Sequence, residues 1–207
     1  MPSKKVLPDI EIKNILIIKY YGIGSILLAS PSIEAIKVKF PKSQIAILTL
    51  AENHQICEII PGIDEVFLLD LENIGHFFTN YVQLILKIRQ KDFDVIVDLE
   101  FFTNFSALTT LLISFLKEKV LVGFNSPLRW RNAIYTLNIS FDHSRHISRV
   151  FSKVFSSFCG DGFEVSLDFD IGRRIISNFS KPVILRETLS FQKPETGDPP
   201  KNICINI

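Results

Sequence analysis

The chain has 207 residues, 47% of them hydrophobic, and its 23 basic and 22 acidic residues nearly cancel. This predicts a globular chain with a substantial core and argues against bulk nucleic-acid binding, so electrostatic recognition must come from a local patch. The cysteines, Cys57, Cys159 and Cys204, are far apart and form no C-x-x-C pair, which argues against a disulfide framework or a zinc site and favours a reducing cytoplasm.

A strand, a two-glycine turn and a helix are predicted in residues 14–40. Ile15–Ile18 is apolar without polar alternation, which is typical of a strand covered on both faces of a parallel sheet. The run ends at Lys19–Ser25, where Gly22 and Gly24 permit a tight turn and close backbone approach. The helix behind them offers unpaired N–H groups and a positive dipole end to an anion, so we expect this loop to contact a ligand.

The start of this helix has two interpretations. Pro31 either lies inside the helix and kinks it, or follows Ser30 as N-cap and becomes the first helical residue. In both cases Ile33, Ile36 and Phe40 share one face.

Apolar strand-like runs and helical patterns alternate through the remainder, with strands expected at residues 44–50, 65–69, 94–97 and 120–122. This order predicts a doubly wound parallel sheet with right-handed crossovers. The clearest helix is residues 74–90, whose apolar residues recur at spacings of three and four. Those apolar residues are Ile74, Phe77, Phe78, Tyr81, Leu84, Ile85 and Ile88.

The longest apolar stretch is Ala107–Leu116. It is about half as long as the roughly 20 residues that a membrane-spanning helix needs. We interpret it as a buried helix, with membrane contact as the alternative.

The motif around the turn resembles a known family. Lys19–Ile36, with Gly24–Ile33 at its centre, is similar to the opening motif of glycosyltransferase family 9, the lipopolysaccharide heptosyltransferases. The resemblance extends over about residues 13–170. Further matches are Asp94–Glu100, Val120–Phe124, Arg131, Tyr135 and His146.

The resemblance implies a Rossmann-like doubly wound parallel sheet that forms the N-terminal half of a GT-B glycosyltransferase. Residues 1–175 would be the acceptor-side domain. A proline-containing linker would occupy residues 176–200, and residues 201–207 would be the first strand of a missing C-terminal nucleotide-sugar domain. We therefore expect the chain to be truncated.

The resemblance also implies an activity: inverting, metal-independent transfer of a heptose or similar sugar from a nucleotide-sugar donor, ADP-linked, to a lipopolysaccharide core or related cell-envelope glycan. The missing domain would hold most of the donor, so this chain alone would be inactive and would need no other cofactor. Its partners would be the nucleotide sugar and an anionic glycan or glycolipid. We expect a cytoplasmic monomer, with peripheral contact at the inner face of the membrane.

One position departs from the family pattern. The family's aspartate after the glycine, its general base, is Ser25 here, and loss of a positioned base costs on the order of a hundred- to ten-thousand-fold in rate. Glu100 is the nearest substitute, because it follows the predicted fourth strand and partial burial among Phe101, Phe102 and Phe105 would make it a better proton acceptor. The alternative for this carboxylate is a helix cap or a salt bridge, and Asp98 is expected to be structural.

Acceptor contacts are expected from the turn, the fourth strand and a basic segment. Residues 124–153 contain four arginines and two histidines against one acid, Asp142. Guanidinium groups bind phosphate and carboxylate bidentately, although a solvated helix face is the alternative. His146 and Arg149 are three apart on an expected helix. The expected acceptor contacts are Tyr20, Gly22, Gly24, Ser25, Phe102, Arg131, His146 and Arg149.

Two other classes of protein remain open. Gly22 and Gly24 begin a dinucleotide-binding pattern, and Glu52 follows the second strand, where a ribose-binding acid could lie; however, Leu27 occupies the third glycine position. The other class is a non-catalytic remnant. This interpretation is favoured by Ser25 in place of the family's base and by the expected absence of the second half.

Overall fold

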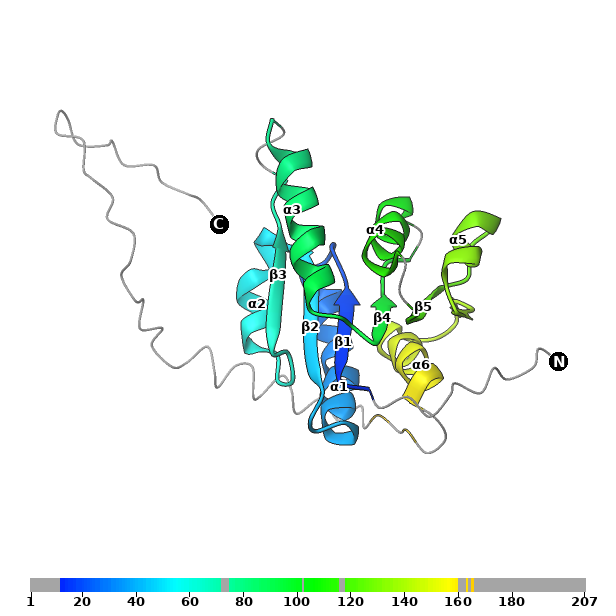
Figure 1. Ribbon diagram of the computed structural model, residues 1–207. Helices are drawn as coiled ribbons and strands as arrows, with labels where there is room; N and C mark the ends of the chain where they lie inside the picture. The colour runs from blue at the N-terminus through cyan, green and yellow to red at the C-terminus, as the bar shows by residue number, and fades with distance from the viewer. Residues whose placement is uncertain are drawn as a thin grey trace, which may run out of the picture.

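Among the described residues, six strands form one parallel sheet in the order β3-β2-β1-β4-β5-β6 (Figure 1). The computed structural model describes residues 12–71, 75–101, 103–115, 118–159, 163 and 165. Phe102, Cys204 and the expected linker and final strand at 176–207 lie outside them. The strands are β1 (Asn14–Ile18), β2 (Gln44–Leu50), β3 (Glu65–Leu69), β4 (Val95–Asp98), β5 (Val120–Phe124) and β6 (Leu137–Ile139).

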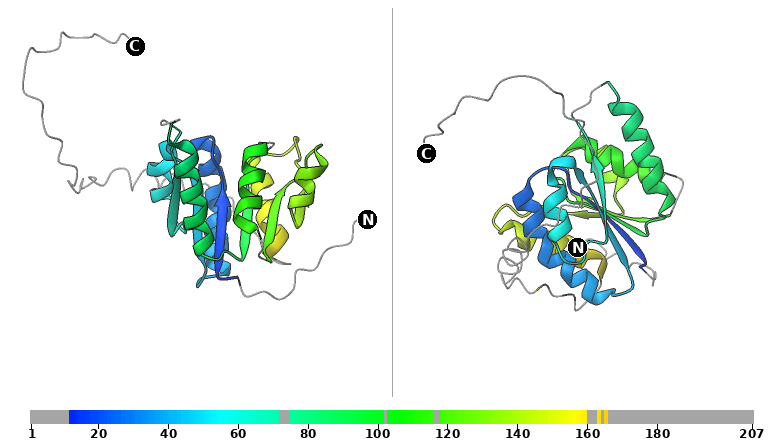
Figure 2. Two further views of the ribbon diagram at one scale, coloured as in Figure 1. Left: turned by 45° about the horizontal axis from the view of Figure 1, so that its top comes forward. Right: turned by 90° about the vertical axis from the view of Figure 1, so that its left-hand side faces the viewer.

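Two layers of helices cover the sheet (Figure 2). Ile15 and Ile17 of β1 pack into the core beneath α1, α2 and α6, whereas Leu16 and Ile18 pack into the core beneath α3, α4 and α5. Because successive residues of a strand face opposite sides, a central strand must be apolar throughout, as β1 is. The helices are α1 (Ile23–Lys39), η1 (Ala51–Asn53), α2 (His54–Ile59), α3 (Phe77–Gln90), α4 (Asn104–Ser114), α5 (Arg129–Ile134) and α6 (Ile147–Cys159).

The doubly wound parallel sheet is therefore confirmed, and the five expected strands are present within a residue or two of their expected bounds. The structure adds β6, a three-residue edge strand. Helix α3 is described from Phe77, and Ile74 lies outside the described residues. The placement of Phe78 on the buried face was wrong, since its side chain is 78% exposed.

Pro31 lies inside α1, which begins at Ile23, so the helix does not start at Ser30. Proline has no N–H to donate to Leu27 O, the carbonyl four residues earlier. The Ser30 hydroxyl donates to that oxygen instead, at 2.7 Å. The side chain before the proline thus satisfies the acceptor that the proline leaves unpaired.

Helix α4 corresponds to the long apolar stretch, and it is buried on one side only. Among the described helices, none is long and apolar enough to cross a membrane. The two cysteines in the described part of the chain, Cys57 and Cys159, are free and buried.

Candidate functional site

The candidate site lies where β1 and β4 end side by side. Ile18 is in register with Asp98, and Leu99 N donates to Ile18 O at 3.0 Å. From β1 the chain continues to β2 on one side of the sheet, whereas β4 lies on the other side, so the two loops flank the point where the strand order reverses. In open α/β sheets ligands bind in the crevice at such a point. We call residues 19–25 the glycine loop.

Glu100 fixes the glycine loop to the end of β4. Its Oε1 accepts hydrogen bonds from Lys19 Nζ at 2.8 Å, from Tyr20 N at 2.7 Å and from Tyr21 N at 3.0 Å. The Lys19–Glu100 ion pair is buried, with both side chains at most 5% exposed. The salt-bridge interpretation of Glu100 thus describes its contacts, and the role of general base stays a prediction. Because Oε1 is occupied, a proton from an acceptor would have to go to Oε2.

The exposed part of the loop begins at Tyr21. Gly22 has a φ of 89°, in the region that L side chains rarely adopt. The Ser25 hydroxyl donates to Gly22 O at 2.8 Å and to Tyr21 O at 3.1 Å, so it holds the turn closed. Gly22, Ile23 and Gly24 are exposed, and the first turn of α1 carries no acid. This surface can accept an anionic or hydroxyl-bearing ligand.

Tyr20 lies beneath the loop and is 1% exposed. Its hydroxyl donates to Thr109 Oγ1 at 3.0 Å, its ring packs on Phe105, and its carbonyl accepts from Asn53 Nδ2 at 2.7 Å. Burial raises the pKa of Tyr20 above its ordinary value. The side chain therefore anchors the loop from within the core, and its contact with an acceptor stays a prediction.

Asp98 lies at the centre of a second cluster of hydrogen-bonded polar residues, and its side chain is fully buried. It accepts hydrogen bonds from the Tyr135 hydroxyl, from Ser106 Oγ at 2.7 Å and from Glu100 N at 2.9 Å. Burial raises the pKa of Asp98 to about 6, although these three hydrogen bonds and Arg131 act in the opposite direction. Since Asp98 holds Glu100 and Glu100 holds the glycine loop, the two carboxylates form a continuous support for the loop.

Arg131 is 0% exposed and belongs to this support. Its Nη2 lies 3.9 Å from Asp98 Oδ2, and none of its guanidinium nitrogens hydrogen-bonds to a described group. The interaction with Asp98 is thus an ion pair in a low-dielectric interior. In this structure Arg131 is not available at the surface, and its expected acceptor contact stays a prediction.

The other basic residues of 124–153 do not gather into one patch. His146 is exposed and immediately precedes α6, with its Nδ1 2.8 Å from Ser148 Oγ. Arg149 is exposed on α6, whereas Arg129 begins α5 in the opposite helical layer. Arg145 pairs with Asp142 at 3.0 Å. The structure brings Tyr20, the glycines, Ser25, Glu100 and Arg131 into one region and leaves His146 and Arg149 in another element.

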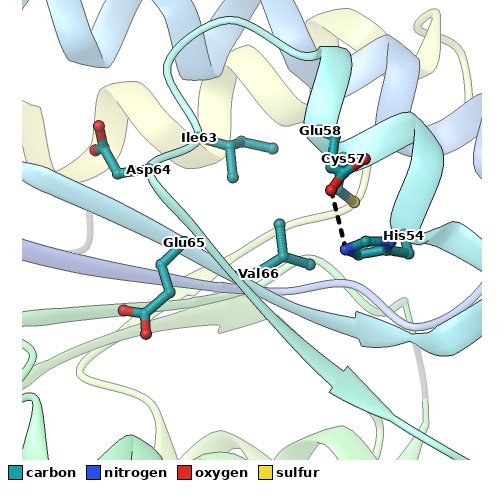
Figure 3. A pocket seen from close by; sticks show the side chains of 7 residues that line it. All are labelled: His54, Cys57, Glu58, Ile63, Asp64, Glu65 and Val66. Atoms are coloured by element: carbon teal, nitrogen blue, oxygen red, sulfur yellow. Dashed lines mark ion pairs between the residues drawn. The ribbon is translucent and has the colours of Figure 1, made fainter. Parts of the chain in front are cut away.

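A hollow of about 450 Å³ lies elsewhere, between α2 and β3 (Figure 3). Its lining includes His54 and Glu58, which pair at 3.3 Å, and Glu65 and Val66. Glu65 and Val66 are the first residues of β3, whereas the glycine loop follows the last residue of β1. Because the strands are parallel, the hollow and the glycine loop lie at opposite ends of the sheet, so the hollow is not part of the loop site. Within the described ranges no group of three or more histidine, cysteine, aspartate or glutamate side chains could hold a metal ion.

Sequence reasoning missed Lys19 and Asn53, which hold the glycine loop through Glu100 and through the Tyr20 carbonyl. The signal for Lys19 was present in the strand pattern. If the first and fourth strands are neighbours, a lysine and a glutamate just beyond their ends can meet. No comparable signal identifies Asn53, because its role depends on the path of the chain after β2.

No family model matches the sequence, and no curated protein matches it. Solved structures do match. E. coli heptosyltransferase WaaC with ADP superposes with a TM-score of 0.63 at 14% identity, over 80% of this chain and 53% of that one. The fold is that of the heptosyltransferases.

Two further solved structures agree. A family 9 glycosyl transferase from Veillonella parvula DSM 2008 gives a TM-score of 0.60 at 17% identity, over 74% of this chain and 44% of that chain. E. coli ADP-heptose lps heptosyltransferase II gives a TM-score of 0.55 at 13% identity, over 82% of this chain and 51% of that chain. The family 9 resemblance is thus confirmed for the fold, and this chain spans about half the length of these three solved proteins.

Proposed function

We propose that the chain is the acceptor-side part of a glycosyltransferase that transfers a heptose or similar sugar from an ADP-linked donor to a lipopolysaccharide core or related cell-envelope glycan. The observation that carries this proposal is the exposed glycine loop, fixed by Glu100 at the point where the strand order reverses. One solved heptosyltransferase with this fold, E. coli WaaC, is described in two structures, with ADP and with ADP-2-deoxy-2-fluoro heptose. A cytoplasmic, metal-independent enzyme that inverts the anomeric carbon is part of the same proposal.

In the proposed reaction an acceptor hydroxyl lies against the glycine loop. Its oxygen forms a bond to the anomeric carbon of the donor, and the bond from that carbon to the diphosphate breaks with its electron pair on the leaving group. The hydroxyl proton passes to a carboxylate. Ser25 donates its own proton to loop carbonyls, so Glu100 through Oε2 is the candidate base, and the loop positions the nucleophile.

The substitution Glu100→Gln tests the base in the complete transferase. If Glu100 removes the proton, kcat falls by about a hundredfold or more while acceptor affinity is retained. Ser25→Ala is the control in the glycine loop, and it leaves kcat within about tenfold because a serine hydroxyl is not the base.

Other outcomes reject the role of Glu100 as base. Unchanged turnover removes Glu100 from the mechanism. A loss of acceptor affinity with kcat preserved shows that Glu100 only fixes the loop through Lys19, Tyr20 and Tyr21.

The function itself is tested with the 207-residue chain. We expect weak binding of a lipopolysaccharide core oligosaccharide in calorimetry, weaker still in Tyr21→Ala, and no sugar transfer without the rest of the enzyme. Tyr21 suits this test because its side chain is 53% exposed in the loop. Rapid transfer by the chain alone would overturn the proposal that another part of the enzyme holds the donor. Absence of acceptor binding would contradict the proposal that this chain is the acceptor-side part.

A nucleotide- or dinucleotide-binding module is the second candidate, because Glu52 is exposed directly after β2. Against it, Leu27 replaces the third glycine and packs against the core of the α1 layer. Tight NAD or ATP binding in a thermal-shift screen, lost in Glu52→Ala, would favour this module. A non-catalytic remnant would bind neither nucleotide and would remain inactive when joined to a donor-side domain.

A further inference from the structure

A row of aromatic rings runs from the glycine loop to the start of α3. The Tyr21 ring meets the Tyr20 ring edge to face, with centroids 6.5 Å apart, and Tyr20 lies 5.4 Å from Phe105 at the start of α4. Phe105 is 6.4 Å from Phe77, the first residue of α3, and Phe77 is 5.6 Å from Phe78. Three segments that are far apart in the sequence thus contribute to one row of rings.

Four of these rings reach the surface. Phe78 is 78% exposed and Tyr21 is 53% exposed, whereas Phe77 and Phe105 between them are half-buried. We call these four residues the aromatic track. Because β1, β3 and β4 are parallel, the loop after β1 and the first turns of α3 and α4 lie at the carboxyl edge of the sheet. The aromatic track is therefore continuous with the glycine loop.

Two buried tyrosines hold the aromatic track in place. The Tyr20 hydroxyl donates to Thr109 Oγ1 at 3.0 Å, and the Tyr81 hydroxyl lies 2.8 Å from the same oxygen. Thr109 Oγ1 in turn donates to Phe105 O at 2.9 Å. The Phe77 ring stacks on Tyr81 with an interplanar angle of 10°. Rings that are fixed before a ligand arrives lose little conformational freedom when it binds.

Tyr21 is held mainly through its backbone. Its N–H donates to Glu100 Oε1 at 3.0 Å, and its carbonyl accepts from Ser25 Oγ at 3.1 Å. The backbone is thus fixed on both sides of the Tyr21 side chain, while about half of that side chain faces solvent. The ring is presented at a defined place beside the exposed glycines.

The helical segments that carry the aromatic track are poor in charge. Residues 75–86 contain no acidic or basic side chain apart from His76, and α4 contains none. Lys19, the cation of the glycine loop, is buried in an ion pair. Asn80 and Asn104 are instead exposed on the first turns of α3 and α4, where they supply amide donors and acceptors. These segments favour an uncharged ligand with hydroxyl groups over an anion.

A sugar ring presents C–H groups on one face and hydroxyl groups around its rim. The C–H face packs on the electron-rich face of an aromatic ring, and the hydroxyls hydrogen-bond to amides. We propose that the aromatic track binds uncharged sugar units of the acceptor glycan, with Tyr21 nearest to the reacting hydroxyl and Phe78 at the far end. The inference deepens the proposed function and rests on it for the ligand, a glycan. The arginines expected to bind the acceptor do not compete for this role, since Arg131 is buried and Arg149 lies on α6.

Calorimetry with the purified chain tests the charge of the sugar units. The probes are a lipopolysaccharide core oligosaccharide and the same oligosaccharide after enzymatic removal of its phosphates. We expect the two dissociation constants to agree within about threefold and to change little with added salt, because ring stacking releases no counterions and is not screened. A loss of affinity of about tenfold or more on removal of the phosphates would show recognition of an anion and overturn the proposal.

Phe78→Ala tests the rings, and its fold should be retained because the side chain is exposed. The substitution should weaken binding of both probes about threefold to tenfold through loss of one ring contact, whereas Phe78→Tyr should bind like wild type. Phe115→Ala is the matched control, because Phe115 is 55% exposed just beyond the other end of α4. It should leave the affinity unchanged. Saturation-transfer NMR from aromatic protons to sugar C–H protons gives a signal that a merely structural role of the rings would not produce.

The remaining outcomes separate this proposal from the proposed function. Equal effects of Phe78→Ala and Phe115→Ala overturn the proposal, as does absence of glycan binding, including the case in which sedimentation equilibrium shows a dimer that Phe78→Ala dissociates. In the complete transferase Phe78→Ala should raise KM for the acceptor and leave kcat unchanged. If sugar is transferred but this variant behaves as wild type, only the role of the aromatic track is wrong. If the rings bind glycan but the complete protein transfers no sugar, only the proposed function is wrong.

Discussion

Single side chains determine how the glycine loop is held. Lys19 and two backbone N–H groups converge on one oxygen of Glu100, and Asn53 binds the carbonyl of Tyr20 from the other side. The expectation of a carboxylate near the loop followed from strand order alone, but its three donors could not be read from spacing. These donors depend on the path of the loop after β1. The sequence does not determine that path, because Gly22 and Gly24 allow many backbone conformations.

Ser30 and Ser32 offer a matched pair within α1. Both are fully buried, but Ser30 Oγ donates to Leu27 O at 2.7 Å, whereas Ser32 Oγ has no hydrogen-bond partner among the described residues. Ser30→Ala should lower the free energy of unfolding by about 1 kcal/mol, because it leaves an acceptor beside Pro31 unpaired. Ser32→Ala should be neutral or stabilising, because it removes a buried polar atom that gains no bond.

Urea unfolding of the two variants supplies the measurement. Both substitutions change serine to alanine inside the same helix, so the difference in helix propensity cancels. Equal effects would show that Ser30 does not compensate for the proline.

At the scale of elements, the sequence predicted the strands better than the helices. Runs such as those of β1 and β4 are unambiguous, because strands buried on both faces must be apolar throughout. The edge strand β6 has three residues and no such run. Helix α4 was expected as a buried helix, but composition alone could not tell which of its faces is buried. The partners that decide this are the hydroxyls of Tyr20 and Tyr81 and the carboxylate of Asp98.

Strand β5 and helix α5 meet at a position that admits only glycine. A Cβ on Gly123 would lie 2.5 to 2.7 Å from three ring atoms of Tyr135, whose hydroxyl binds Asp98. Gly123→Ala should therefore displace the ring and lower the free energy of unfolding by about 1 to 3 kcal/mol, as overpacking of a core does.

The control for this change is Gly24→Ala, because a Cβ on Gly24 would meet no heavy atom within 4 Å. It lies in the first turn of α1, so it should be neutral or slightly stabilising in thermal denaturation. A melting temperature for Gly123→Ala that matches this control would show that the Tyr135 ring can move aside without loss of stability.

At the scale of the whole molecule, the site exists because strands far apart in sequence are neighbours. The topology could be predicted, and so could the meeting of the first and fourth strands. The dispersal of the basic residues could not, since it depends on α5 and α6 covering opposite faces of the sheet. The burial of Arg131 follows from its ion pair with Asp98, and no feature of its own segment indicates that pair.

The stability of the molecule should depend on pH through Asp98. Burial raises the pKa of Asp98 in the folded protein to about 6, from its ordinary value of 3.8. Between these values the folded state binds a proton that the unfolded state does not, so this contribution grows as pH falls from about 7 to about 4 and is lost as pH rises through 6. The change is on the order of 2 kcal/mol.

Asp98→Asn should abolish this contribution, so wild type should gain stability relative to the variant when pH is lowered. Urea unfolding of both proteins at about pH 7 and about pH 5 measures the difference, and other titrating groups cancel in it. A relative change of the opposite sign would contradict the raised pKa. If the variant does not fold, carbon-13 NMR titration of the Asp98 carboxyl in wild type gives the pKa directly.

The connectivity of the sheet also orders events during synthesis on the ribosome. Strands β1, β2 and β3 leave the ribosome together with α1 and α2 and can assemble as a half-sheet, but the other edge of β1 stays open until β4 is made. An open, wholly apolar strand edge is a template for aggregation. Lys19 lacks its carboxylate until Glu100 arrives, 81 positions later. The glycine loop therefore acquires its final conformation only after β4 and Glu100 are made, and a nascent chain halted before β4 would be a client for chaperones.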